Sequence, residues 1–402
     1  MMSVGDDHSN STDPRTREAS VTIPVYGQLP FVPERASGCD IFTKDGRRIL
    51  DLYGGHAVAA LGYGHPRLVK AIAEQSRKLL FQSNAVALDI RADAAEKLTN
   101  IAPDGLDRVF FVNSGAEANE NALRMACMAT GRSKVLAITH GFHGRTAAAA
   151  AVTWNSDRWY GFPAKPFEVD FIPRDDVAAA EDMIGSDIAA VIFEPVQGVA
   201  GAYDLSPEFL QALRAASREH GVMLIADEVQ SGIGRSGQFF AVQTYQLTPD
   251  ILTSAKALGG GIPCGAVLCS HAIAANFGAG DLGSTFGGGP IAAAAIAATI
   301  DTIADEHLLM NVRRAEALIR ERCVLGPVTK IQGMGLLLGL VCNRPAVEVR
   351  DALLQRDILT GTSSDPNVLR ILAPLVLEAS HINHLAEALG NIVPATNQRN
   401  PR

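Results

Sequence analysis

Short runs of apolar and β-branched residues alternate with longer helical patterns through the middle of the chain. The run that begins at Arg108, "RVFFVN", is followed by "AEANENALRMACMATG", whose apolar spacing predicts a helix that ends at Gly131. A second helix is predicted in "SPEFLQALRAASREHG", which opens with Ser206 as N-cap and closes at Gly221. Further strands are expected in "KVLAIT", "IAAVIFE", "VMLIADE", "ILTSA" and "GAVLCS".

This alternation predicts an α/β fold with a mostly parallel central sheet that is covered by helices on both faces. In such sheets the active site lies beyond the carboxyl ends of the strands. Residues that directly follow the predicted strands are therefore the first candidates for chemistry.

The two ends of the chain have less regular patterns than its middle. Near the start, "GCDIFTKDGRRILDLY" predicts a β-hairpin with "KDG" at its turn, and near the end short strands such as "GLLLGLVC" and "VLRILAP" alternate with helical stretches. We expect both ends to pack together as a smaller α+β domain beside the central one. The expected division is a disordered tail over residues 1–20, an N-terminal part of the small domain over 21–64, a large cofactor-binding domain over 65–290 and a C-terminal small domain over 291–402.

Composition narrows the class of protein. The chain has 402 residues, which is more than one hydrophobic core usually serves and so favours two domains. A net charge of −8 without a dense Lys/Arg cluster argues against nucleic acid as a partner. The polar start has no apolar segment typical of a signal peptide, and the most apolar stretches are too short for a membrane span. The six cysteines form no CxxC pair, so we expect reduced thiols, no metal site and a cytoplasmic location.

The first strand-to-helix junction with candidate chemistry is "FFVNSGAEANE". It places Ser114, Gly115 and Ala116 where small residues let backbone N–H groups approach an anion at a helix N-terminus. This pattern is typical of a phosphate-binding turn, although it is neither a Walker loop nor a GxGxxG motif. An ordinary βα turn capped by serine is the alternative.

The stretch "HGFHGRTAAA" follows the next predicted strand. Phe142, on a loop flanked by glycines, could lie flat on a ring, and Arg145 could grip a carboxylate through two parallel hydrogen bonds. A surface loop with a solvated arginine is the simpler interpretation of this stretch by itself. We assign no acid–base role to His143, because a lysine further along the chain supplies that chemistry.

Two ionisable residues end later strands. Asp227 directly follows the apolar run of "LIADEVQSGIGRSG", and a carboxylate at the end of a buried strand is costly unless it is paired. If Asp227 faced a pyridine nitrogen, it would keep that nitrogen protonated; an aspartate that caps the next turn is the alternative. Lys256 follows the next strand, between "ILTSA" and three glycines, and burial there would lower its pKa and make its amine a nucleophile. With the phosphate-binding turn and Phe142, these residues fit a pyridoxal phosphate (PLP) site in which Lys256 forms a Schiff base.

Eight motifs follow one another along the chain: "LDLYGGHAVAALGYGHP", "FFVNSGAEANEN", "GFHGRT", "EPVQG", "LIADEVQSGIGRSG", "TSAKALGGGIP", "GSTFGGGP" and "VLRILAPL". In this order they resemble the motifs of the class III aminotransferases of fold type I, especially the acetylornithine and ornithine aminotransferases. The resemblance extends from about Pro24 to the C-terminus. It implies a PLP-dependent enzyme that works as an obligate homodimer with two shared active sites.

The resemblance also implies roles for individual residues. Lys256 would form the Schiff base and move the proton during catalysis, and Asp227 would pair with the pyridine nitrogen. The other cofactor contacts that it implies are Ser114, Gly115 and Ala116 at the phosphate, Phe142 and Val229 on the two faces of the ring, Gln230 at the ring hydroxyl, and Thr285 at the phosphate of the neighbouring subunit's cofactor.

Three further residues are implied in substrate binding. Arg145 resembles the residue that binds a substrate carboxylate, and Arg370 resembles the one that binds the α-carboxylate of the keto acid. A dicarboxylate such as 2-oxoglutarate would need both arginines at once. Ser284 would contact the amino donor.

The chain departs from the family pattern at three positions. Val199 replaces the glutamate of the usual "EPVQGE", which is understood to pair with the acceptor-site arginine while an amine donor is bound. We therefore expect Arg370 to stay free in both half-reactions and donor choice to shift away from simple ω-amines. Gly289 stands where asparagine is usual and would alter only a local turn. His56 occupies a commonly apolar position; it could line the pocket, although a structural histidine is the favoured interpretation.

Together these interpretations predict a PLP-dependent aminotransferase with a ping-pong mechanism. The expected reaction moves the terminal amino group of N2-acetylornithine, or of a close relative, to 2-oxoglutarate, in amino-acid metabolism and within it arginine biosynthesis. Aminotransferases for 4-aminobutyrate, ornithine, succinylornithine or diaminobutyrate remain alternatives, as does a PLP-dependent racemase or epimerase. A nicotinamide dehydrogenase is disfavoured because no GxGxxG motif opens a βαβ unit, and a cofactor-free binding module would be colourless.

Overall fold

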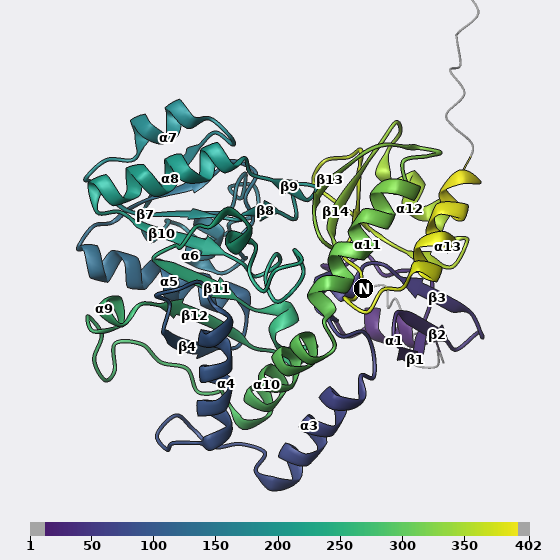
Figure 1. Ribbon diagram of the computed structural model, residues 1–402, viewed down its shortest axis with the longest axis horizontal. Coiled ribbons are helices and arrows are strands. Elements are labelled where there is room, and N and C mark those ends of the chain that lie inside the picture. The colour runs from purple at the N-terminus through teal and green to yellow at the C-terminus, as the bar shows by residue number, and fades with distance from the viewer. Residues whose placement is uncertain (1–12, 393–402) are drawn as a thin grey trace, which may run out of the picture.

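The computed structural model describes residues 13–392 of the chain. Two bodies lie side by side: a larger one built on a central sheet, and a smaller one in which both ends of the chain meet (Figure 1). Residues 1–12 of the predicted tail lie outside the described residues. The predicted disorder is not seen at residues 14–19, which form a short helix, α1 (Pro14–Ala19). Asp13 caps this helix by accepting a hydrogen bond from the Arg15 amide.

A seven-stranded sheet forms the centre of the larger body. Six of its strands are parallel and β12 runs antiparallel to both neighbours, so the expected α/β fold with a mostly parallel sheet is confirmed. β12 is reversed because residues 255–264, which lead into it from β11, are too few for a helical crossover. In sheet order the strands are β4 (Arg108–Val112), β12 (Gly265–Cys269), β11 (Ile251–Ser254), β10 (Met223–Asp227), β7 (Ile188–Phe193), β5 (Lys134–Ile138) and β6 (Glu168–Ile172).

Helices cover both faces of this sheet (Figure 1). α5 (Gly115–Thr130) packs along the strands, begins at the Ser114 cap and ends at Gly131, whose φ of 68° is left-handed. α8 (Pro207–His220) has the predicted Ser206 and Gly221 caps. The other elements of this body are α4 (Asp89–Ile101), α6 (Ala147–Ala151), α7 (Val177–Met183), β8 (Val196–Gln197), β9 (Tyr203–Asp204), η2 (Ala241–Tyr245), η3 (Lys256–Gly259) and α9 (His271–Ala274).

The smaller body joins sequence-distant ends of the chain. The predicted hairpin forms β2 (Asp40–Thr43) and β3 (Arg48–Asp51), and β3 pairs in parallel with β15 (Ile358–Leu359). The remaining elements are β1 (Pro33–Ser37), α2 (Gly54–Ala57), α11 (Leu308–Arg322), β13 (Val328–Met334), β14 (Leu337–Cys342), α12 (Ala346–Leu354), β16 (Gly361–Thr362), β17 (Val368–Ile371) and α13 (Ala379–Gly390).

Two helices carry the chain between the bodies, α3 (Pro66–Lys78) and α10 (Pro290–Asp305), and they pack against each other. Gly289 is the N-cap of α10 and offers no side chain to the free amides, whereas an asparagine there could accept a hydrogen bond. The domain boundaries at 64/65 and 290/291 stay a prediction.

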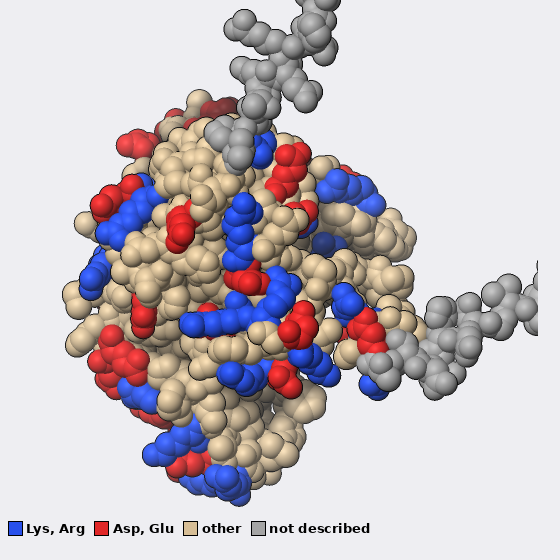
Figure 2. All heavy atoms as spheres, turned by 90° about the vertical axis from the view of Figure 1, so that its right-hand side faces the viewer, with Lys and Arg blue, Asp and Glu red and all other residues tan. Residues whose placement is uncertain are grey.

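One face of the smaller body carries both basic and acidic side chains (Figure 2). On the face that Figure 2 shows, basic and acidic side chains are interspersed rather than gathered by sign. None of the helices within residues 13–392 combines the length and the apolar character that a membrane crossing requires.

Candidate active site

A cavity of about 440 Å³ lies at the carboxyl ends of the central strands. Its walls come from the segments that directly follow β4, β5, β7, β10 and β11, because the carboxyl ends of parallel strands share one edge of a sheet. Nine of the twelve predicted cofactor-binding, catalytic and substrate-binding residues line this one cavity: Ser114, Gly115, Ala116, Phe142, Arg145, Asp227, Val229, Gln230 and Lys256.

Lys256 is held in a strained backbone conformation at the cavity wall. Its φ of 46° is left-handed, which a residue with a Cβ rarely adopts unless the surrounding structure enforces it. Burial lowers the pKa of the Lys256 ammonium, and the neighbouring Asp227 and Glu194 carboxylates act in the opposite direction. The amine therefore loses its proton more readily than a surface lysine does.

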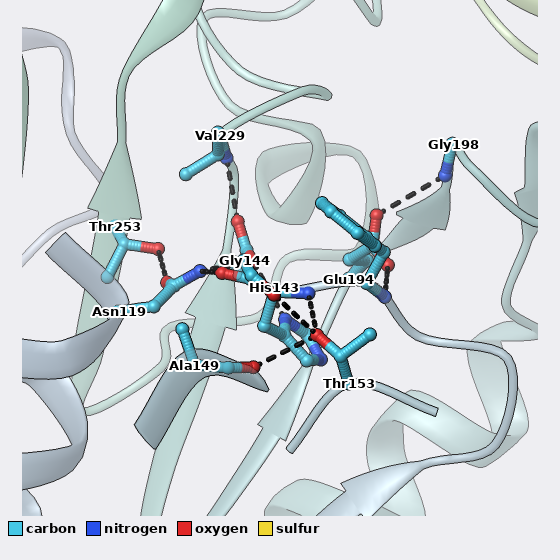
Figure 3. A network of polar contacts seen from close by, with 11 residues as sticks. Asn119, His143, Gly144, Ala149, Thr153, Glu194, Gly198, Val229 and Thr253 are labelled. Atoms are coloured by element: carbon cyan, nitrogen blue, oxygen red, sulfur yellow. Dashed lines mark hydrogen bonds and ion pairs between the residues drawn. The ribbon is translucent and has the colours of Figure 1, made fainter. Parts of the chain in front are cut away.

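The Asp227 carboxylate, which ends β10, is held by three donors in a network drawn in Figure 3. His143 Nδ1 and Asn119 Nδ2 both donate to Oδ2 at 2.7 Å, and the Val229 amide donates to Oδ1 at 3.0 Å. A carboxylate offers about four acceptor positions, so one further donor can be accommodated. A protonated ring nitrogen would be such a donor.

Two residues of this network had no assigned part in the site. Asn119, inside α5, also donates to the His143 carbonyl at 2.7 Å and accepts from the Thr253 hydroxyl at 2.7 Å. His143, which we did not assign to acid–base chemistry, is fully buried and orients Asp227 instead. A buried amide in a helix interior is a signal that could have pointed to Asn119, since such groups need partners.

Glu194 is a third residue that the sequence reasoning missed. It directly follows the apolar strand β7, much as Asp227 ends the apolar strand β10, so the same sequence signal is present. Its carboxylate accepts from the Phe142 amide at 2.8 Å and from the Gly198 amide at 3.3 Å, which ties the aromatic loop to the turn after β8 (Figure 3). Burial raises the pKa of Glu194 to about 7.

Close backbone approaches shape the cavity walls. A Cβ on Gly115 would lie 2.6 Å from Val229 Cγ1, and a Cβ on Gly198 would lie 1.7 Å from Gln230 Oε1. Only glycine therefore fits at either position with the present side chains in place. Gln230 Oε1 is buried at the cavity and accepts no hydrogen bond from residues 13–392, so it is available to a ligand hydroxyl.

The two arginines differ in setting. Arg145 is exposed at the cavity, with its guanidinium 4.8 Å from the centre of the Trp159 ring. Arg370 is buried on β17, and its guanidinium donates to the Thr362 carbonyl at 2.7 Å, the Gly198 carbonyl at 3.3 Å and the Tyr53 hydroxyl at 2.8 Å.

Within residues 13–392 the Arg370 guanidinium donates only to neutral oxygens, and the Glu194 carboxylate favours its charged form without a direct contact. Val199, which follows Gly198, lines the cavity with an apolar side chain. A buried cation without a directly bound counter-ion is costly, and an arriving carboxylate would reduce that cost.

Three other residues lie outside the cavity lining. Ser284 Oγ accepts from Asn113 Nδ2 at 3.2 Å, and Asn113 itself lines the cavity. Thr285 is exposed on the surface. His56 is also exposed and bonds to Tyr53 rather than lining the cavity.

These side chains fit PLP. The N-terminus of α5 suits a phosphate, Asp227 suits a pyridinium N–H, the unpartnered Gln230 oxygen suits a ring hydroxyl, and the Lys256 amine suits an aldehyde. Phe142 and Val229 provide apolar surface between these polar groups.

Comparison with known proteins points the same way. The family profile described as aminotransferase class-III matches residues 23–393. The acetylornithine aminotransferase of Methanothermobacter thermautotrophicus is 37% identical over 94% of this chain and 97% of its own length. The enzyme of the same name from Methanopyrus kandleri is 39% identical over 91% of this chain and 96% of its own.

Solved structures share the fold as well. The acetylornithine aminotransferase from Elizabethkingia anophelis superposes with a TM-score of 0.83 at 30% identity, covering 94% of this chain and 97% of that one. The ornithine aminotransferase from Toxoplasma gondii, described with partial occupancy of PLP at its active site, has a TM-score of 0.88 at 26% identity and covers 94% of both chains. Taken with the residues gathered at the cavity, these matches show that the chain belongs to the PLP-dependent class III aminotransferases.

Proposed function

We propose that the protein transfers the terminal amino group of N2-acetylornithine, or of a close relative, to 2-oxoglutarate in a ping-pong reaction. The observation that carries this proposal is one cavity in which Lys256 and Asp227 meet Arg145, with the buried Arg370 next to it. The acetylornithine aminotransferases among the relatives favour this donor over the ornithine, succinylornithine, 4-aminobutyrate and diaminobutyrate alternatives.

PLP, when bound, supplies an electron sink for negative charge at the carbon that bears the reacting amine. Lys256 would then remove a proton from that carbon and return one, and its lowered pKa favours the neutral amine that this role needs. Asp227 would accept a hydrogen bond from the ring nitrogen, and its three donors fix the carboxylate in place for this contact.

The other residues of the cavity hold the cofactor. The amides of Gly115 and Ala116, with Ser114 beside them, take the phosphate at the positive end of α5. Phe142 and Val229 would pack on the ring faces, and Gln230 Oε1 would accept from the ring hydroxyl. We assign these roles from the family resemblance and from the position of each residue in the cavity wall.

A dicarboxylate acceptor would use both arginines. Arg370 takes the carboxylate next to the keto group, since it is buried and has only neutral acceptors. Arg145, exposed at the cavity, takes the far carboxylate. Ser284 contacts the donor from a more peripheral position.

We further propose a cytoplasmic homodimer in which Thr285 reaches the cofactor phosphate of the partner subunit. Thr285 is exposed and its neighbour Phe286 is 63% exposed, with its ring 5.2 Å from that of the exposed Phe81. An exposed aromatic pair of this kind is typical of a protein interface. A Phe286→Asp substitution should give monomers by light scattering and abolish activity; an active monomer would contradict the shared site.

The decisive experiment is a donor screen under single-turnover conditions, following the visible absorption of the bound cofactor. N2-acetylornithine should react fastest among the five donor classes, and 2-oxoglutarate should restore the starting spectrum. Loss of optical activity from an amino acid without any keto acid would instead favour a racemase. Lys256→Ala protein should lose turnover, and parental rates in that variant would refute the mechanism.

A further inference from the structure

A left-handed turn at the edge of the cavity holds a histidine near the buried arginine. Gly54, Gly55, His56 and Ala57 have φ values of 53°, 56°, 62° and 68°. Left-handed backbone is unfavourable for every residue that has a Cβ, and consecutive residues rarely adopt it. Such strain persists only where surrounding contacts enforce it, and it gathers at functional sites.

The contacts that enforce this turn come from both of its ends. The buried Asp51 carboxylate accepts from the Tyr53 amide at 2.7 Å and from the Gly54 amide at 2.9 Å. The Ala57 carbonyl accepts from the fully buried Arg235 guanidinium at 3.4 Å. These contacts hold the backbone on both sides of His56.

A continuous line of hydrogen bonds joins His56 to Arg370 through Tyr53. Arg370 Nη2 lies 2.8 Å from the Tyr53 hydroxyl, and His56 Nδ1 lies 3.0 Å from the same oxygen. A guanidinium only donates, so the Tyr53 oxygen accepts from Arg370 and its single hydrogen is left for His56. When the Tyr53 hydroxyl donates to His56, Nδ1 is the acceptor and the imidazole is neutral, with its proton on Nε2.

Other features of His56 agree with a neutral acceptor. Partial desolvation of its ring lowers the pKa of the His56 imidazole, the positive charges of Arg370 and Lys256 lower it further, and Asp51 opposes them. The edge of the ring also packs on Tyr53, with 4.7 Å between ring centres and 61° between planes. These contacts restrict the orientation of the phenol.

We propose that His56 is a positioning residue for the carboxylate site: it fixes the Tyr53 hydroxyl and thereby the direction in which Arg370 faces a substrate carboxylate. The inference rests on the proposed function, because that function makes a carboxylate the ligand of Arg370. Without the imidazole acceptor, the Tyr53 hydrogen turns freely and the guanidinium loses a fixed partner. Carboxylate affinity then falls, while proton transfer at Lys256 is untouched.

The test compares His56→Asn with His56→Leu in the holoenzyme. Asparagine has nearly the same shape as leucine, places Oδ1 where Nδ1 was and tolerates left-handed backbone, whereas leucine offers no acceptor. Glutarate binding is measured by calorimetry, without turnover, and the kcat and KM for 2-oxoglutarate are measured beside it. Both variants are repeated in a Tyr53→Phe background.

We expect His56→Leu to weaken glutarate binding and raise the KM roughly three- to tenfold, the effect of one net hydrogen bond, with kcat nearly unchanged. His56→Asn should lie close to the parent, and neither change should matter in the Tyr53→Phe background. Should His56→Leu fail to fold, His56→Gly removes the imidazole without backbone strain.

Equal weakening by asparagine and leucine, or an effect that persists without the Tyr53 hydroxyl, would overturn the inference. A parent that shows no transamination would refute the proposed function instead. The glutarate measurements still decide the role of His56 in that case, because they need no reaction.

Discussion

Replacing Val199 by glutamate tests how the buried arginine selects substrates. The Val199 side chain lines the cavity, and the preceding Gly198 carbonyl lies 3.3 Å from Arg370 Nη1. A carboxylate at position 199 would therefore have the Arg370 guanidinium within reach. The new ion pair would compete with any substrate carboxylate for that guanidinium.

The size of the effect follows from the setting of Arg370. Two unit charges about 4 Å apart attract by about 4 kcal/mol at an effective dielectric constant near 20. The desolvation cost of a new carboxylate offsets a large part of this attraction. Arg370 is buried, and a glutamate at position 199 would share its environment. A net pairing of about 1.4 kcal/mol remains as a working figure, which corresponds to about tenfold in affinity.

The assay is the ratio of kcat/KM for glutamate to kcat/KM for N2-acetylornithine. In the proposed function, glutamate would place its α-carboxylate at Arg370, whereas the terminal amine of N2-acetylornithine would bring no carboxylate there. We expect Val199→Glu to lower this ratio roughly tenfold. Val199→Gln is the matched control, because it has the same size without the charge, and it should change the ratio by much less.

Two results would refute the reasoning. If glutamine and glutamate at position 199 shift the ratio equally, the effect is steric and Arg370 takes no part in it. If neither substitution shifts the ratio, the arginine does not discriminate between these donors. In both cases the buried charge of Arg370 would need another ligand.

Three further predictions concern the cofactor site and the core. Gly198→Ala should weaken PLP binding roughly tenfold or more in an absorbance titration, because the new Cβ would lie 1.7 Å from Gln230 Oε1. Gly27→Ala is the control, because its Cβ would meet no atom within 4 Å. Burial raises the pKa of Glu228 from 4.5 to about 7. The contribution of this carboxyl to the free energy of unfolding is therefore fully present below pH 4.5, and about 3 kcal/mol of it is lost as the pH rises through 7. Glu228→Gln should flatten the dependence of Tm on pH over that window, and parallel profiles for parent and variant would contradict this. Asn119→Leu should lower kcat roughly tenfold with the keto-acid KM little changed, because the β10 carboxylate loses a buried donor; an unaltered kcat would rule that role out.

Much of the architecture could be predicted from local pattern. The helix after β4 ends at Gly131 as its spacing indicated, and the hairpin between β2 and β3 turns at Gly46, whose φ of 85° requires glycine. Residues after successive strands could also be expected to share a site, because parallel strands bring their carboxyl ends to one edge. Asp227 and Lys256 are predicted in this way, and both line the same cavity.

Other features could not be read from the chain. His143 and Asn119 hold Asp227 from 84 and 108 residues away, and no local pattern encodes such a distance. The left-handed turn at His56 follows from anchors at Asp51 and Arg235, of which the second lies far along the chain.

By itself, then, the sequence determined the strands and helices, the order of the motifs and the chemical groups that end each strand. These depend on periodicity and on short-range steric preferences, which neighbouring residues settle among themselves. Only the tertiary structure decided which donors surround each ionisable group, that Arg370 faces neutral acceptors, and that Tyr53 connects it to His56. Those outcomes depend on packing between distant segments, where burial sets the value of every charge and hydrogen bond.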